Sequence, residues 1–304
     1  MSWDPDAGDG AQLSKSALKR VQRDLQQVST SDNPGLLVCI DDKDVRTVHA
    51  IILGPDATPY SFAPFIFRVQ FPADYATTSP KVRLLTTHDG AVRMGPNLYA
   101  EGKVCLSILG TWNGPGWLPT MTLESTLINL QALLHPDPLI LEPGYENEAA
   151  DVRASYCVAV EHEVLRVAVL SQVDYTGRAG DAATPAEGAT LLKSPPYIDA
   201  LTEARDFLWD NFDSMAETWA TRARDLARAH DGKTLGNLSP IAVVCRPPKG
   251  GAGVFEFAKI AKRIDAVAAA IRAARSAAQG GEGGGTSEGV DGGGGGGAGG
   301  GTTE

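Results

Sequence analysis

Hydrophobic and polar positions divide the first third of the chain into one helix followed by strands. Between residues 13 and 28 the apolar positions recur at spacings of three and four, which is the pattern of an amphipathic helix. The polar face of this helix carries four basic side chains: Lys15, Lys19, Arg20 and Arg23. Four apolar segments follow, at 35–40, 46–53, 64–71 and 81–85. They are consecutive and separated by short turns, so the pattern predicts an antiparallel meander of four strands.

The pattern changes after the fourth strand. Residues 86–120 have no period and are rich in Gly, Pro, Asn and Trp, which is typical of a functional loop region. Helical periodicity returns in four segments: 121–134, about 147–170, about 197–230 and 255–278. The α+β pattern thus predicts four parts: a flexible N-terminal arm at 1–11, a core at 12–170, a helical extension at 171–278 and a disordered Gly-rich tail at 279–304.

Composition and charge exclude several functional classes. The net charge is −10, and an acidic chain is not suited to coat nucleic acid or an anionic membrane. No apolar run approaches the ~18 residues of a membrane span, and the acidic first ten residues do not resemble a secretory signal. Four scattered cysteines without zinc-ligand spacing predict reduced thiols and no metal. We therefore expect a cytoplasmic or nuclear protein without nucleic-acid or membrane partners.

Cys105 is the candidate nucleophile, and it lies in the irregular segment GPNLYAEGKVCLSILGTW. Asn97 precedes it by eight residues (105 − 97). An Asn amide beside a reactive thiol is suited to donate a hydrogen bond to the oxyanion of a tetrahedral intermediate. Taken alone, however, the two residues favour an ordinary buried cysteine, since Cys is among the residues most often buried.

Six separate sequence pieces change this interpretation. They are Leu18-Lys19-Arg20-Val21; Gly54-Pro55 with Thr58-Pro59-Tyr60; Phe71-Pro72 with Tyr75; Ser79-Pro80-Lys81-Val82; Pro96-Asn97 with Gly102-x-x-Cys105-Leu106; and Trp117-x-Pro119. In order and spacing they resemble the ubiquitin-conjugating enzyme family along nearly all of residues 13–150. The run from Cys105 to Trp112 and the segment 142–146 are similar to its large branch, which includes the Z class and has a lengthened loop and a helical extension.

The resemblance implies a fold and an activity. The fold is the α+β ubiquitin-conjugating (UBC) fold, with a four-stranded antiparallel meander sheet, an N-terminal helix, a central helix and here a C-terminal helical extension. The activity is to accept ubiquitin, or a ubiquitin-like modifier, from an activating enzyme as a thioester on Cys105. The modifier then passes to a lysine amine of a protein substrate or of a target bound to a ubiquitin ligase. No cofactor is bound, because the activating enzyme uses the ATP.

The resemblance also implies site residues. Asn97 would stabilise the oxyanion or order the loop that does so, and Asp137 would help to desolvate and deprotonate the incoming lysine. The basic face of the first helix is similar to the surface that meets the activating enzyme, although a solvated face is the usual explanation of such charges. Pro119 matches the second loop that contacts ligases.

One departure motivates an alternative function. Gly95 stands where the family has a His that holds the active-site loop by hydrogen bonds to the backbone, so the rigidity of the loop is in question more than its chemistry. The alternative is a catalytically inactive, conjugating-like binding module that presents ubiquitin or a partner. The presence of Cys105 argues against it. A Cys hydrolase is disfavoured because none of the five His residues stands in a protease-like context.

Overall fold

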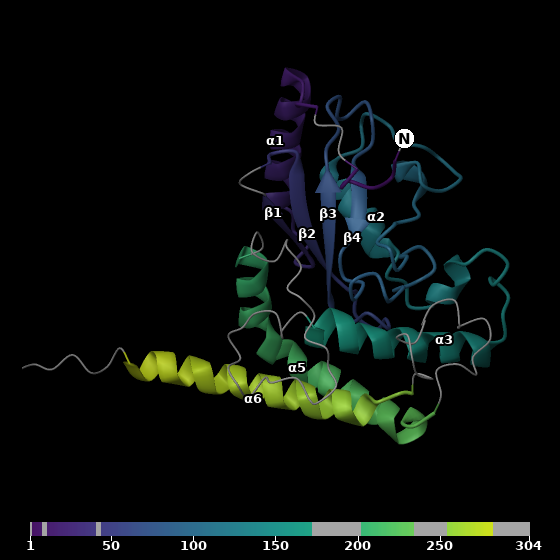
Figure 1. Ribbon diagram of the computed structural model, residues 1–304, viewed down its shortest axis with the longest axis vertical. Coiled ribbons are helices and arrows are strands. Elements are labelled where there is room, and N and C mark those ends of the chain that lie inside the picture. The colour runs from purple at the N-terminus through teal and green to yellow at the C-terminus, as the bar shows by residue number, and fades with distance from the viewer. Residues whose placement is uncertain (1, 8–10, 41–43, 172–201, 234–253, 282–304) are drawn as a thin grey trace, which may run out of the picture.

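The computed structural model describes residues 2–7, 11–40, 44–171, 202–233 and 254–281. Its elements in the first half are α1 (Lys15–Ser29), β1 (Leu36–Ile40), β2 (Thr47–Leu53), β3 (Pro64–Gln70), β4 (Lys81–Leu84), a 3-10 helix η1 (Ser107–Leu109) and α2 (Leu123–Ala132). After these come a second 3-10 helix η2 (Pro138–Leu141), α3 (Ala150–Glu163), a π-helical segment η3 (Val164–Ser171), α5 (Thr202–His230) and α6 (Phe257–Gly281). Figure 1 shows these elements in order along the chain.

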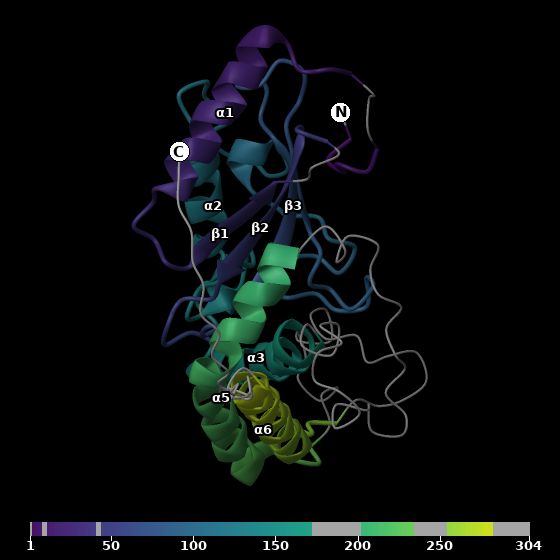
Figure 2. The same ribbon diagram turned by 90° about the vertical axis from the view of Figure 1, so that its left-hand side faces the viewer.

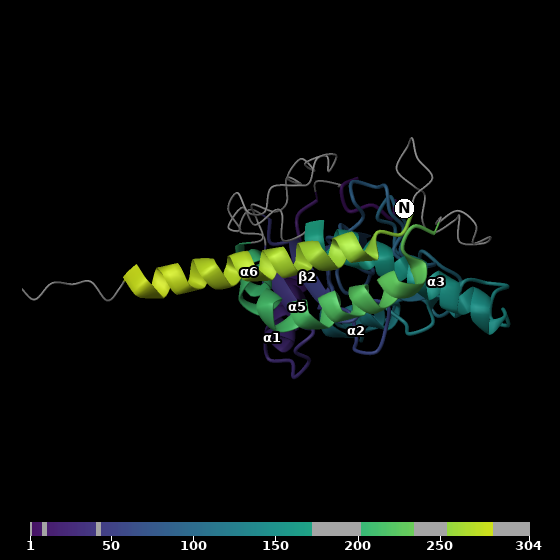
Figure 3. The same cartoon turned by 90° about the horizontal axis from the view of Figure 1, so that it is seen from below.

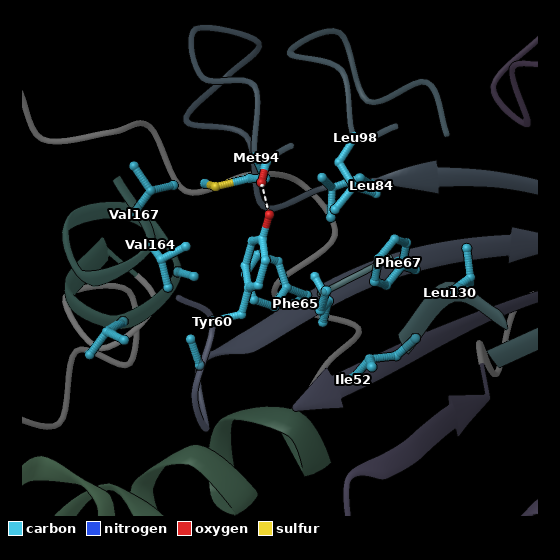
Figure 4. Close-up of a cluster of buried hydrophobic side chains, with 14 of the residues drawn as sticks. Ile52, Tyr60, Phe65, Phe67, Leu84, Met94, Leu98, Leu130, Val164 and Val167 are labelled. Atoms are coloured by element: carbon cyan, nitrogen blue, oxygen red, sulfur yellow. Dashed lines mark hydrogen bonds between the residues drawn. The ribbon is translucent and has the colours of Figure 1, made fainter. Parts of the chain in front are cut away.

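The four strands form one antiparallel sheet in the order β1-β2-β3-β4, which confirms the predicted meander and fold class. Helices α1 and α2 pack against each other and against the sheet, and Figure 2 shows them next to its strands. Alternation along β3 sends Phe65 and Phe67 toward these helices, where they meet Leu84 of β4 and Leu130 of α2 in the core (Figure 4). The strand is buried on its other face too, where Ile66 joins Cys39 and Ile51 in a second, smaller cluster.

Helix boundaries follow local capping chemistry. Ser14 caps α1 by accepting a hydrogen bond from the Ala17 amide at 3.1 Å, so the helix begins two residues after Leu13. Thr122 and Ser125 form a capping box that starts α2. The segment predicted at 147–170 begins at Ala150 and changes to π-helical geometry at Val164. Side-chain caps, which the apolar periodicity does not report, thus set the starts of α1 and α2, whereas no side chain caps α3.

The helical extension packs against the sheet domain. Helices α5 and α6 run side by side below the sheet, as Figure 3 shows. The indole Nε1 of Trp219 on α5 donates to the Ser61 carbonyl at 2.9 Å, and Arg222 donates to both carboxylate oxygens of Glu161 at 2.6 and 3.0 Å. Buried residues of both helices belong to the same apolar cluster as the sheet.

The four-part division of the chain stays a prediction. Within the expected N-terminal arm, Asp4 and Asp6 form ion pairs with Arg83, and Asp6 also pairs with Arg68. These two arginines lie directly opposite each other on β3 and β4, so the carboxylates offset a repulsive pair of like charges. Helix α6 continues to Gly281, while residues 282–304 of the expected tail, residues 172–195 of the polar connection and the expected helix start at Tyr197 lie outside the described residues.

A buried carboxylate at the end of α3 predicts acid sensitivity. Burial alone would raise the pKa of Glu163, but a hydrogen bond from His162 Nδ1 at 3.0 Å and the charge and hydrogen bonds of Arg166 outweigh it and lower the pKa to about 2. A carboxyl whose pKa is lower in the folded state stabilises the fold above its unfolded pKa, here 4.5, and this contribution is lost as the pH falls toward 2.

We expect Glu163→Gln to reduce this acid sensitivity. Between pH 6 and pH 3 the wild type should lose about 2 kcal/mol more unfolding free energy than the variant, at about 1.4 kcal/mol per pH unit below the unfolded pKa. Urea unfolding at several pH values measures this, with Glu217→Gln, whose side chain is 81% exposed, as the control. Parallel pH curves for wild type and Glu163→Gln would contradict the prediction.

Candidate active site

Cys105 lies on a short hairpin that follows the sheet. The Cys105 amide donates to the Asn97 carbonyl at 2.9 Å, and the Tyr99 amide donates to the Lys103 carbonyl at 3.0 Å. Asn97 therefore lies directly opposite Cys105. The turn uses Gly102 at φ +91°, where a Cβ would lie 2.5 Å from the Leu84 carbonyl oxygen. Only glycine allows this close approach, which sets the hairpin against the end of β4.

A second hydrogen bond joins the two predicted residues. The Asn97 side-chain Nδ2 donates to the Cys105 carbonyl at 2.9 Å, while its Oδ1 is buried and accepts no hydrogen bond from the described residues. Cys105 is a free cysteine and only 2% exposed. The structure thus brings Asn97 and Cys105 together, and the Asn97 amide holds the backbone beside the thiol.

Tyr99 is a neighbour of the thiol that the sequence reasoning missed. Residues two apart on a strand share a face, so Tyr99 and Cys105 are diagonal neighbours on one side of the hairpin. Burial raises the pKa of Tyr99, and the side chain of Cys105 raises it further. No signal in the sequence indicated this neighbour, because residues 86–120 have no regular pattern.

Side chains from elsewhere hold the loop before Asn97, in place of the family's His. The Tyr60 hydroxyl donates to the Met94 carbonyl at 2.9 Å, and Figure 4 shows it pointing at that oxygen. Arg93 Nε donates to the Gly95 carbonyl at 2.9 Å, and its Nη2 donates to the Pro96 carbonyl. Three consecutive carbonyls are therefore fixed by two side chains, although residue 95 has none of its own.

Asp137 occupies a different hydrogen-bonding environment. Its Oδ2 accepts from Arg153 Nη1 of α3 at 2.6 Å, and its backbone amide donates to His135 Nδ1 at 3.0 Å. Its Oδ1 is buried and has no hydrogen-bond partner among the described residues. In the described part of the chain, no hydrogen bond or ion pair joins Asp137 to Cys105 or Asn97.

The neighbourhood of Asp137 includes a second thiol, which we expect to be unreactive. Burial raises the pKa of Cys157, and the carboxylates of Asp137 and Glu161 raise it further, to about 11. At pH 8 the thiolate is then about a thousandth of the total, so alkylation should be roughly 100-fold slower than for free cysteine. Mass spectrometry after timed iodoacetamide treatment measures this rate. Asp137→Asn should speed the reaction at Cys157, and a rate equal to that of free cysteine would contradict the assignment.

The predicted partner-binding residues gather around one groove. This groove of about 550 Å³ is lined by the loop at 74–77 and by four of the five predicted residues: Lys19, Arg20, Arg23 and Pro119. The fifth, Lys15, lies exposed on α1 outside the groove. Arg20 is engaged within the chain: its Nε donates to Asp24 at 2.7 Å and its Nη1 to the Pro119 carbonyl at 2.9 Å. Lys19 and Arg23 are the exposed cations of this surface.

The described residues hold neither a metal-binding cluster nor a membrane-spanning helix. Among them, no three His, Cys, Asp or Glu side chains group in a way that could hold a metal ion. None of the described helices is both long and apolar enough to span a membrane.

Comparison with known proteins agrees with the geometry. The family model described as ubiquitin-conjugating enzyme matches residues 20–163. Ubiquitin-conjugating enzyme E2 Z of Xenopus tropicalis is 36% identical over 208 residues, which cover 67% of this chain and 66% of that protein. The E2 Z proteins of Danio rerio and Homo sapiens are each 40% identical, over 178 and 177 residues, and the matches cover 57% of this chain and 54% and 50% of those proteins.

The chain thus spans between half and two thirds of the length of these relatives. The match includes the sheet, the Cys105 hairpin and α2, and it confirms the resemblance found in the sequence. The chain belongs to the ubiquitin-conjugating enzyme family, in a branch similar to ubiquitin-conjugating enzyme E2 Z.

Proposed function

We propose that the chain is a transferase that carries ubiquitin, or a ubiquitin-like modifier, as a thioester on Cys105. The observation that carries this proposal is that Asn97 lies opposite the free cysteine Cys105 on the hairpin and donates to its backbone carbonyl, in a chain of this family. The Cys105 thiolate attacks the carbonyl carbon of the modifier's thioester on an activating enzyme, and the enzyme's thiol leaves. One thioester replaces another, so the step needs no further energy source, and ATP is consumed only upstream.

The second step transfers the modifier to an amine. A neutral lysine amine attacks the Cys105 thioester and an oxyanion develops on the carbonyl. The C–S bond then breaks, the Cys105 thiolate leaves as the amide bond forms, and the proton lost by the nitrogen passes to solvent. Asn97 supports this step by fixing the backbone at Cys105, because its side-chain amide donates to the Cys105 carbonyl. The Oδ1 of Asp137 has no hydrogen-bond partner among the described residues, and this unused acceptor supports its proposed role with the acceptor lysine.

We assign the partner-binding surfaces to the groove beside α1. Lys19 and Arg23, with Lys15 beyond it, offer the positive charge for an activating enzyme, and Pro119 offers the ligase contact. The protein substrates are those that a ligase brings near Cys105. The acidic net charge supports a protein that works without nucleic-acid or membrane partners. The scattered cysteines support a place in the cytoplasm or nucleus, and the use of ATP by the activating enzyme supports the absence of a bound cofactor.

A charging assay tests the proposal. The chain is incubated with ubiquitin, ATP and a panel of activating enzymes and is then analysed on gels with and without reductant. We expect a shift of one ubiquitin that disappears with reductant, is absent in Cys105→Ala and persists in Cys157→Ala, the matched control for the second thiol. A folded wild type that no activating enzyme charges would refute the transferase and favour the binding module, which the intact thiol otherwise disfavours.

A further inference from the structure

Arg93 makes more contacts at the active-site loop than any sequence motif indicates. Its Nε donates to the Gly95 carbonyl at 2.9 Å, and its Nη2 donates to the Pro96 carbonyl and to Glu142 Oε2, the latter at 3.1 Å. Its guanidinium carbon lies 4.3 Å from the centre of the Tyr99 ring. We infer that Arg93 is the positioning residue of the Cys105 loop, an inference that rests on the proposed transferase function.

The guanidinium is suited to this task by its shape. A planar fork of donors can bind two consecutive carbonyls and stack on an aromatic ring at the same time, which a lysine ammonium cannot do. The Arg93 side chain is only 10% exposed, so solvent screens these contacts little. Glu142 supplies the opposite charge, so the buried cation is paired.

The loop needs a donor from elsewhere because residue 95 cannot supply one. A Cβ at Gly95 would lie 3.0 Å from the Tyr60 hydroxyl, closer than an ordinary van der Waals contact. That hydroxyl in turn holds the Met94 carbonyl. The small residue at position 95 therefore leaves room for Tyr60, and Arg93 supplies the donors from two residues upstream.

The contacts of Arg93 lead directly to the thiol. Pro96, whose carbonyl it holds, precedes Asn97, and Asn97 exchanges two hydrogen bonds with Cys105. Tyr99, on which it stacks, neighbours the Cys105 side chain. Glu142 belongs to the segment after η2, so one side chain connects that segment to the hairpin. Arg93 moves no proton; it fixes the position of the groups that surround the reacting carbonyl.

Single-turnover discharge of the charged chain onto free lysine tests the inference. We expect Arg93→Ala and Arg93→Lys to lower the maximal discharge rate on the order of 100-fold, the usual effect of a misplaced reacting group, with the KM for lysine unchanged. Methylguanidinium at low millimolar concentration should restore part of the rate in Arg93→Ala. The matched control is Arg224→Ala, which removes a guanidinium paired with Asp265 in the extension and should discharge normally.

Other outcomes overturn the inference. If Arg93→Lys discharges like wild type, only the charge matters and the fork has no role. If Arg93→Ala loses activity in step with its unfolding midpoint and methylguanidinium restores nothing, Arg93 is a stabilising residue only. Failure of the wild type to charge would refute the proposed function instead. In that case hydrogen exchange decides: faster exchange at residues 94–106 in Arg93→Lys, with α5 and α6 unchanged, supports the positioning role, and unchanged exchange refutes it.

Discussion

Asn97→Ala is expected to slow the transfer of the modifier from Cys105 to lysine by about 100- to 1000-fold, the usual cost of removing one oxyanion donor. In the wild type the Asn97 amide donates to the Cys105 carbonyl at 2.9 Å, and the Cys105 amide donates back to the Asn97 carbonyl. Ala keeps the backbone bond and removes the side-chain donor. Charging should slow as well, because the Cys105 thiol and the carbonyl of the modifier's thioester react in both steps.

Two variants separate the donor from the shape of the side chain. Asn97→Asp keeps the size but replaces the donor by an oxygen that faces the Cys105 carbonyl, so it should be at least as slow as Asn97→Ala. Asn129→Ala is the matched control, because Asn129 also donates to a backbone carbonyl, that of Ser125 at 2.8 Å, on the exposed face of α2. Discharge of Asn97→Ala within threefold of wild type would remove Asn97 from the mechanism.

Asp24→Ala is expected to cost about 3 kcal/mol of unfolding free energy, near the lower end for breaking a buried charge pair. Asp24 is 0% exposed and accepts three hydrogen bonds: from Arg20 Nε at 2.7 Å, the Tyr75 hydroxyl at 2.6 Å and the Leu123 amide at 3.1 Å. Leu123 is the first residue of α2, whose free amides attract a negative charge. One carboxylate thus joins α1, the loop at Tyr75 and the start of α2.

Urea unfolding measures this cost, and Tyr75→Phe calibrates it. Burial, and then the hydrogen bond and charge of Asp24, raise the pKa of Tyr75 far above its usual value, so the hydroxyl remains a donor at every pH of the experiment. Removing the Tyr75 hydroxyl should cost about 1 to 2 kcal/mol of unfolding free energy, less than removing the Asp24 carboxylate, which accepts three hydrogen bonds. A loss below 1 kcal/mol in Asp24→Ala would show that Arg20, through its bonds to the Pro119 and Met121 carbonyls, holds these elements without it.

The sequence predicted the sheet because strand alternation has a local signature, whereas the assignment of Cys105 needed the family resemblance of six separate pieces. Alternation in β3 is set by neighbours two residues apart, and Asn97 and Cys105 lie on one hairpin. Asp24 has no such signature. Its partners Tyr75 and Leu123 are 51 and 99 residues away in the chain.

The polar contacts of Arg93 and Asp137 could not be predicted from the sequence either. Arg93 lies in a segment without period, and nothing local indicates that it would reach Glu142, 49 residues later. Asp137 was assigned by its place in the family pattern, which does not report the Arg153 side chain that binds it. Long-range polar contacts of this kind depend on the packed fold, so a pattern of apolar spacings cannot contain them.

The bond from Trp219 to the Ser61 carbonyl has a consequence for how the molecule melts. The indole and the buried faces of α5 and α6 continue the apolar cluster of the sheet, so neither part can open without exposing the other. Two regions that share one core unfold as a single cooperative unit. We therefore expect one calorimetric transition for the protein. A shortened version ending at residue 170 should be prone to aggregation, because its sheet domain would present that apolar surface to water.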